Sequence, residues 1–122
     1  LTSVLASKGF NITGIDIDKE KCNKIHNGIL PFFEPDLEKT LKNGLKKKLV
    51  ISNDFSLIKD CDMIFVTVGT PQKSNGSIEL SMIKNAITNI GKILAKSKKN
   101  PIILIKSTII PGTMKEKIWK KR

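Results

Sequence analysis

The sequence predicts an α/β protein built on a doubly wound parallel sheet. Two runs, 63–68 and 102–106, are almost wholly apolar, as strands buried on both faces of a parallel sheet are. Helical spacing of apolar residues recurs between the strand-like runs, so strands and helices alternate along the chain. The 122 residues are 39% hydrophobic, which is enough for one domain of ordinary size.

The chain begins with a predicted helix and a predicted strand. "LTSVLASKGF" has the spacing of the last turns of an amphipathic helix, with Leu1, Val4 and Leu5 on one face. A start inside a helix favours a fragment of a longer chain. Residues 11–15 then alternate as a short strand does, and this strand ends at Asp16.

Two predicted helices follow the first strand. One covers about 18–27, with Asp18 as its N-cap and Gly28 as its C-cap. A turn at two prolines leads to the other, over about 35–47. The apolar stripe of this second helix consists of leucines spaced four residues apart, namely Leu37, Leu41 and Leu45.

The second half continues the alternation. A strand over 48–52 and a helix of one or two turns over 54–61 precede the apolar strand 63–68. A loop then leads to a long helix, about 79–97. Its inward residues are expected to be Ile83, Ala86, Ile87, Ile90, Ile93 and Leu94. The strand 102–106 is followed by a turn at Pro111–Gly112 and a last helix.

This order of elements predicts a Rossmann-like sheet that is incomplete. In a dinucleotide-binding half the spatial order of the strands is 3-2-1-4-5-6. If the strand ending at Asp16 is strand 2, then the central first strand and its glycine-rich loop are missing from these residues. Two buried strands would each lose a neighbour and leave backbone groups unpaired. We therefore expect that residues 1–122 do not fold autonomously.

Polar residues follow three of the predicted strands at their carboxyl ends, where ligands of open α/β sheets bind. Asp16 could accept both ribose hydroxyls of NAD and repel the 2′-phosphate of NADP, or could instead cap the next helix. Gly69 and Thr70 end the strand 63–68, either as ligand contacts or as a turn. The cluster from Lys106 to Thr108 ends the next strand, and turn chemistry explains it less well.

Other residues exclude several classes of site. Cys22 and Cys61 lack a CxxC partner and a neighbouring histidine, so we expect small buried hydrophobes and neither a disulfide nor a metal site. His26, the single histidine, lies at a helix end. No apolar run reaches the roughly 18 residues that span a bilayer. The net charge is +11, but every basic residue except Arg122 is a scattered lysine, which disfavours nucleic-acid readout.

Three segments together resemble one known family. "GIDIDKEKCNKIHNGILPFFEPDLEKTL", "CDMIFVTVGTPQKSNGSIELSMIKNA" and "ILIKSTIIPGTMKEKI" look like the N-terminal, NAD-binding domain of the nucleotide-sugar 6-dehydrogenases, and most like its UDP-glucose 6-dehydrogenases. The resemblance covers nearly all 122 residues in order.

The resemblance implies NAD as cofactor and roles for four residues. Asp16 matches the acid that binds the adenosine ribose, and Lys21 matches a lysine at the same end of the cofactor. Thr70 matches the threonine of a GTP turn beside the cofactor. Thr108 matches the threonine of a KST turn near the nicotinamide and the catalytic water. The family's catalytic cysteine belongs to a second domain that is absent from this chain, and neither cysteine here matches it.

Residues 1–122 are therefore expected to be a partial NAD-binding domain, inactive alone. The whole enzyme would be a cytoplasmic homo-oligomer that oxidises UDP-glucose to UDP-glucuronate with two NAD, for polysaccharide biosynthesis. UDP-N-acetylmannosamine and GDP-mannose remain alternative substrates, and no metal, membrane or nucleic acid is expected as a partner. The alternative of another class is a basic α/β binding module without enzymatic activity, which rests on the charge alone.

Overall fold

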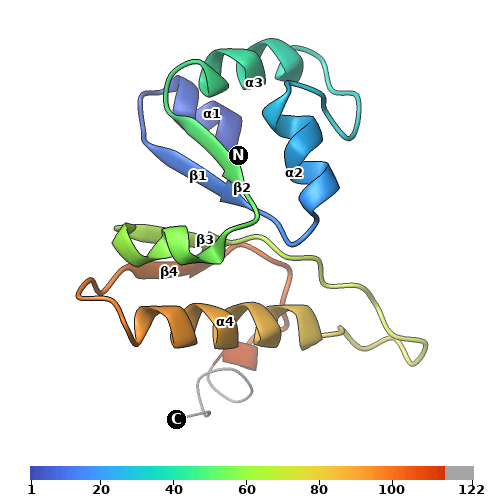
Figure 1. Ribbon diagram of the computed structural model, residues 1–122. Helices are drawn as coiled ribbons and strands as arrows, with labels where there is room; N and C mark the ends of the chain where they lie inside the picture. The colour runs from blue at the N-terminus through green and yellow to red at the C-terminus, as the bar shows by residue number, and fades with distance from the viewer. Residues whose placement is uncertain (115–122) are drawn as a thin grey trace. The chain divides into compact units, whose positions relative to one another are not determined.

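Figure 1 shows the computed structural model, which describes residues 1–114. The chain divides into two compact units, the first from Leu1 to Leu57 and the second beginning at Ile58. Strands and helices alternate, and every strand pair is parallel, which confirms the predicted α/β class. The last helix predicted after Pro111 falls largely on residues 115–122, outside the described part of the chain.

The first unit contains a two-stranded parallel sheet and three helices. Strand β1 (Ile12–Ile15) pairs with β2 (Leu49–Ser52), and the register runs from Ile12 opposite Leu49 to Ile15 opposite Ser52. This is the pairing expected of strands 2 and 3 in the predicted order. The helices are α1 (Thr2–Ser7), α2 (Lys19–His26) and α3 (Leu37–Leu45). The core of the unit forms around Ala6, Leu41 and Leu49.

Helix α1 buries a different face from the predicted one. Leu1 and Val4 are 52% and 48% exposed, whereas Ser3 and Ala6 are buried. The physical reason is the close approach of α1 to α3 at Gly44. A Cβ placed on Gly44 would lie 3.4 Å from the Cβ of Ala6, so the contact admits small side chains rather than the large apolar ones.

The ends of α2 and α3 follow ordinary capping rules. The Asp18 side chain accepts a hydrogen bond from the Lys21 N–H at 3.0 Å, which confirms Asp18 as N-cap. Helix α2 ends at a C-cap one residue before Gly28, whose φ of +76° is the left-handed conformation that follows many helices. Helix α3 is shorter than predicted, and its N-cap Asp36 has a φ of +60°.

The second unit repeats the parallel pairing. The 3-10 helix η1 (Phe55–Asp60) leads to strand β3 (Met63–Val66), which pairs with β4 (Ile102–Ile105) from Met63 opposite Ile102 to Val66 opposite Ile105. This pairing is the one expected of strands 4 and 5. Helix α4 (Ser81–Leu94) runs along this sheet in Figure 1 and buries Ile83 and Ile90.

The strands of the second unit are not buried on both faces, contrary to the prediction. Ile64 and Val66 are buried, but Met63 and Phe65 are 44% and 40% exposed. Their register partners Ile102 and Leu104 are exposed as well. Side chains alternate between the faces of a strand, so these four residues share one face of the sheet. Among the described residues α4 covers the sheet on a single side, and the all-apolar composition alone could not show this.

The loop between β3 and α4 contains a small hairpin. Gln72 and Ile78 form an isolated antiparallel bridge, and the Lys73 N–H donates to the Ser77 carbonyl at 2.7 Å. Gly76 makes the turn with a φ of +81°. This loop leads directly into α4, and at the start of that helix the Glu79 side chain accepts a hydrogen bond from the Ser81 N–H at 2.8 Å.

Candidate functional site

The carboxyl end of β1 places Asp16 in the first unit. Asp16 follows the last residue of β1, and its N–H donates to the Ser52 carbonyl at 3.2 Å, extending the strand pairing by one step. Its side chain is 35% exposed, so solvent still reaches it although the backbone is held by the strand pairing. A carboxylate held at a strand end in this way can accept hydrogen bonds from the hydroxyl groups of a ligand.

Two donors hold the carboxylate of Asp16. Oδ1 accepts from the Asp18 N–H at 3.0 Å, and Oδ2 accepts from Lys21 Nζ at 2.5 Å. Lys21 lies in the first turn of α2, which begins close behind β1, so the five-residue spacing brings its ammonium back over the strand end. The structure therefore joins Asp16 and Lys21, two of the predicted site residues, in one cluster.

The pKa shifts of this pair follow from their contact. Partial burial by itself raises the pKa of Asp16, but the hydrogen bonds from Lys21 and Asp18 and the Lys21 charge outweigh it and hold the pKa below its ordinary value of 3.8. The hydrogen bond to Asp16 raises the pKa of Lys21 above its ordinary 10.5, against the opposing effect of burial. Both groups are thus charged at neutral pH, and the ionised carboxylate of Asp16 can only accept hydrogen bonds.

The competition between the two aspartates for the helix cap is resolved. Asp18 caps α2, and its Oδ1 accepts the Lys21 N–H. Asp16 accepts the Asp18 N–H instead and makes no cap of α2. The carboxylate of Asp16 is therefore positioned by the turn without serving as the turn's cap, which leaves its exposed side for a ligand.

Cys22 forms hydrogen bonds next to this cluster, and the sequence analysis did not predict them. Its thiol is buried, as predicted, but its Sγ also donates to two backbone carbonyls, that of Ser52 at 3.4 Å and that of Asp16 at 3.6 Å. These contacts join α2 to the carboxyl ends of both strands. The position of Cys22 on its helix could have shown that it faces inward. It could not have shown the hydrogen bond, because the partner Ser52 lies 30 residues away. The other cysteine, Cys61, is half-buried, and its pKa is raised by desolvation.

The carboxyl ends of β3 and β4 place the two predicted threonines in the second unit. Thr70 and Thr108 each lie a few residues beyond the end of one of these neighbouring parallel strands, so their turns leave the same edge of the sheet. Thr70 is half-buried and Thr108 is exposed. Among the described residues a Cβ on Gly69 would meet only Met82 Sδ, at 3.7 Å, so the backbone at Gly69 leaves room for a neighbouring group.

Side-chain and backbone contacts link the two turns. The Lys106 N–H donates to the Val66 carbonyl at 2.9 Å, and Ser107 Oγ donates to the Val68 carbonyl at 2.7 Å. Lys106 itself is exposed. The predicted Lys-Ser-Thr cluster therefore divides into an exposed lysine, a serine that bonds the neighbouring turn and an exposed threonine.

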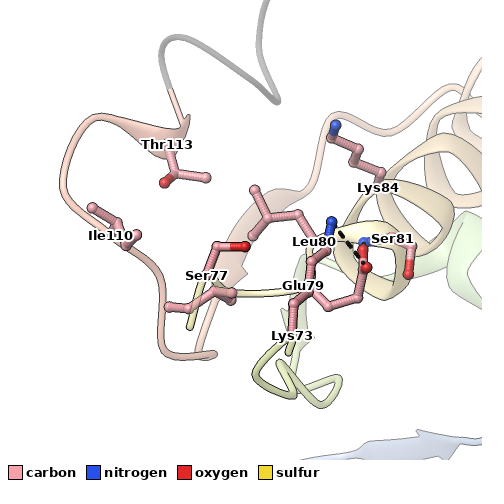
Figure 2. Close-up of a pocket in the computed structure, with 9 residues that line it drawn as sticks. Lys73, Ser77, Glu79, Leu80, Ser81, Lys84, Ile110 and Thr113 are labelled. Atoms are coloured by element: carbon pink, nitrogen blue, oxygen red, sulfur yellow. Dashed lines mark hydrogen bonds and ion pairs between the residues drawn. The ribbon is translucent and has the colours of Figure 1, made fainter. Parts of the chain in front are cut away.

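A separate hollow opens beside the start of α4 (Figure 2), with the hairpin loop and α4 on one side and Ile110 and Thr113 on the other. Glu79 lines it and is held by Lys73 at 3.2 Å and by the Ser81 N–H at 2.8 Å. The bond from Ser81 and the contact with Lys73 hold the pKa of Glu79 below its ordinary 4.5. Neither Thr70 nor Thr108 lines this hollow, and Glu79, the one carboxylate among its described lining residues, already has partners.

Metal and membrane sites are not apparent in the described part of the chain. Residues 1–114 contain no group of three histidine, cysteine, aspartate or glutamate side chains that could hold a metal ion. Within the same residues no helix is both long enough and apolar enough to cross a bilayer. His26 ends α2 and is exposed.

Comparisons with known proteins give one family. Residues 1–122 match a family model described as "UDP-glucose/GDP-mannose dehydrogenase family, NAD binding domain". The GDP-mannose 6-dehydrogenase of Pseudomonas syringae pv. tomato is 38% identical over 112 residues, which are 90% of this chain. The UDP-glucose 6-dehydrogenase YwqF of Bacillus subtilis is 37% identical over 111 residues, which are 89% of this chain.

Solved structures show the same similarity. A ternary complex of GDP-mannose dehydrogenase from Pseudomonas aeruginosa matches 94% of this chain with a TM-score of 0.90 and 31% identity. A UDP-glucose dehydrogenase from Pyrobaculum islandicum matches 92% with a TM-score of 0.87 and 25% identity. These neighbours confirm the Rossmann-like fold class. This chain spans only about a quarter of these proteins, 26% and 24% of the two relatives and 27% and 26% of the two structures.

Proposed function

Because this chain belongs to the UDP-glucose/GDP-mannose dehydrogenase family and matches its NAD-binding domain, we propose that it is part of that domain in a nucleotide-sugar 6-dehydrogenase. NAD is the cofactor of the matched domain. The proposal places the substrate-binding and catalytic domain, with the nucleophilic cysteine, outside residues 1–122. Neither Cys22, which is buried against two carbonyls, nor Cys61 is given that role.

The observation that carries the proposal is the cluster of Asp16 and Lys21 at the carboxyl end of β1. Its fit to NAD rests on the donor and acceptor chemistry, because a half-exposed carboxylate with a lowered pKa is an acceptor for the two hydroxyls of a ribose. The same negative charge disfavours the 2′-phosphate of NADP. Lys21 contributes by holding the carboxylate and by offering an ammonium at the adenosine end of the cofactor.

We assign Thr70 to a position beside the cofactor, and Thr108 to the neighbourhood of the nicotinamide and the catalytic water. Support comes from their position beyond the carboxyl ends of two adjacent parallel strands, where ligands of this fold class bind. NAD, when bound, supplies the group that accepts the hydride. The residues of this chain bind and orient the cofactor, and the covalent chemistry belongs to residues elsewhere in the enzyme.

Two substrates have support. The Lys-Ser-Thr turn and the loop after Val68 resemble those of UDP-glucose enzymes, which favours oxidation of UDP-glucose to UDP-glucuronate. The 38% identity to a GDP-mannose 6-dehydrogenase favours GDP-mannose as the second candidate. A cytoplasmic homo-oligomer is the form we propose for the enzyme.

The test uses the full-length protein encoded by the gene. Calorimetry should give binding of NAD and much weaker binding of NADP. NADH release is then followed with UDP-glucose, GDP-mannose and UDP-N-acetylmannosamine in parallel. Release with none of the three, together with no NAD binding, would contradict the proposed function. Binding of any polyanion with a steep salt dependence would mark nonspecific lysine electrostatics, and a preference among nucleic-acid sequences would be needed to favour a nucleic-acid function.

A further inference from the structure

The backbone pairing of β3 and β4 ends before the two threonine-bearing turns begin. The last backbone bond between the strands runs from the Lys106 N–H to the Val66 carbonyl at 2.9 Å. Thr70 lies four residues beyond Val66, and Thr108 lies two residues beyond Lys106. Without a further contact, each turn would be free to move relative to the other.

Ser107 supplies that further contact. Its Oγ donates to the Val68 carbonyl at 2.7 Å, in a partly buried position between residues 39 apart in the chain. Among the described residues this is the hydrogen bond that joins the turn after β3 to the turn after β4. Ser107 precedes Thr108 directly, and Val68 lies two residues before Thr70.

We propose that Ser107 is a positioning residue that sets the relative placement of the turns carrying Thr70 and Thr108, and so prepares the part of the cofactor site that these turns form. The consequence for NAD rests on the proposed function, whereas the link between the turns does not. Ser107 acts through the Val68 carbonyl, since its hydroxyl is already engaged there. Turns that are already held in place reduce the free-energy cost of ordering them when a ligand binds.

The chain offers a matched control in Ser97. Ser97 Oγ donates to the Lys59 carbonyl at 2.6 Å, across 38 residues, and also accepts the Lys99 N–H at 3.0 Å. Lys59 precedes β3 and Ser97 precedes β4, so this bond joins the amino ends of the same two strands. Ser97→Ala removes at least as many hydrogen bonds as Ser107→Ala, at the end of the sheet away from the turns.

The experiment measures hydrogen exchange and NAD binding in the full-length protein. Exchange is followed by mass spectrometry in peptides covering 67–72 and 106–110, without NAD, and the dissociation constant for NAD is measured by calorimetry. Ser107→Ala should speed exchange in both peptides and weaken NAD binding by about fivefold to tenfold, the scale of one lost hydrogen bond. Ser107→Thr keeps the hydroxyl and should restore both readouts to within about twofold of the wild type. Ser97→Ala should leave both readouts near those of the wild type.

The outcomes distinguish the positioning role of Ser107 from the proposed function in NAD binding. If Ser107→Ala and Ser97→Ala behave alike, or if Ser107→Thr does not restore exchange, Ser107 has no positioning role. If Ser107→Ala does not fold, Ser107→Cys provides a weaker donor of similar shape, and intermediate exchange then supports the role while wild-type exchange overturns it. If the wild-type protein does not bind NAD, the proposed function fails, and the exchange comparison still decides whether Ser107 links the turns.

Discussion

The substitution Asp16→Ala removes the carboxylate at the end of β1 and so tests the proposal that this carboxylate binds the ribose of NAD. Its effect on stability should be small, at most about 1 kcal/mol, because the side chains of the ion pair are 35% and 43% exposed and water screens their attraction. Its effect on NAD binding should be larger. Hydrogen bonds to a charged group are worth about 1.5–3 kcal/mol each. Both oxygens of Asp16 already accept one bond from the protein, so we expect a net loss of about 1–3 kcal/mol, or about 5- to 150-fold in the dissociation constant.

The assay is calorimetric titration of the full-length protein with NAD and with NADP, at equal ionic strength. Glu20→Ala is the control, because Glu20 also pairs with a lysine of α2, Lys24 at 2.8 Å, but its side chain is 79% exposed. Asp16→Ala should weaken the binding of NAD and reduce the ratio of NAD affinity to NADP affinity, whereas Glu20→Ala should change neither quantity. Unchanged NAD affinity in Asp16→Ala would show that β1 is not the strand whose end binds the ribose.

The remaining predictions concern stability. Gly28→Ala should destabilise the protein by about 1–2 kcal/mol, because Gly28 has a φ of +76° and a Cβ there would lie 3.3 Å from the Lys42 side chain. Gly91→Ala should stabilise it by about 0.5–1 kcal/mol, because Gly91 lies inside α4 and no atom of the described residues lies within 4 Å of an added Cβ. Urea midpoints of the full-length protein measure both, and shifts of the same sign would contradict the reasoning. Asp16 has a lowered pKa, so its contribution should be present above pH 3.8 and fade as the pH falls through the folded-state value. The stability difference between the wild type and Asp16→Asn should therefore shrink below about pH 4, and a difference constant down to pH 2 would exclude the ion pair as its source.

Local patterns in the sequence predicted most of the fold. Capping residues located α2, and apolar spacing located α3 and α4, because these signals act within a few residues of the chain. The prediction of which face of α1 is buried was wrong, because that face is set by the contact with Gly44, almost 40 residues away. The exposure of Met63 and Phe65 was also missed, because an apolar strand does not indicate whether one or two of its faces are covered.

The candidate site shows the same division between local and distant information. Asp16 was located from the strand that it follows and Lys21 from the family resemblance, whereas the ion pair between them was seen only in the structure. The groups that hold the strand ends were not predictable, because Cys22 reaches Ser52 and Ser107 reaches Val68 across 30 and 39 residues. In each unit a side-chain donor forms hydrogen bonds at the point where backbone pairing between parallel strands comes to its end. Residues that follow strand ends can be located in the sequence as candidate ligand contacts, whereas the distant hydrogen bonds of Cys22 and Ser107 beside those ends are seen only in the folded chain.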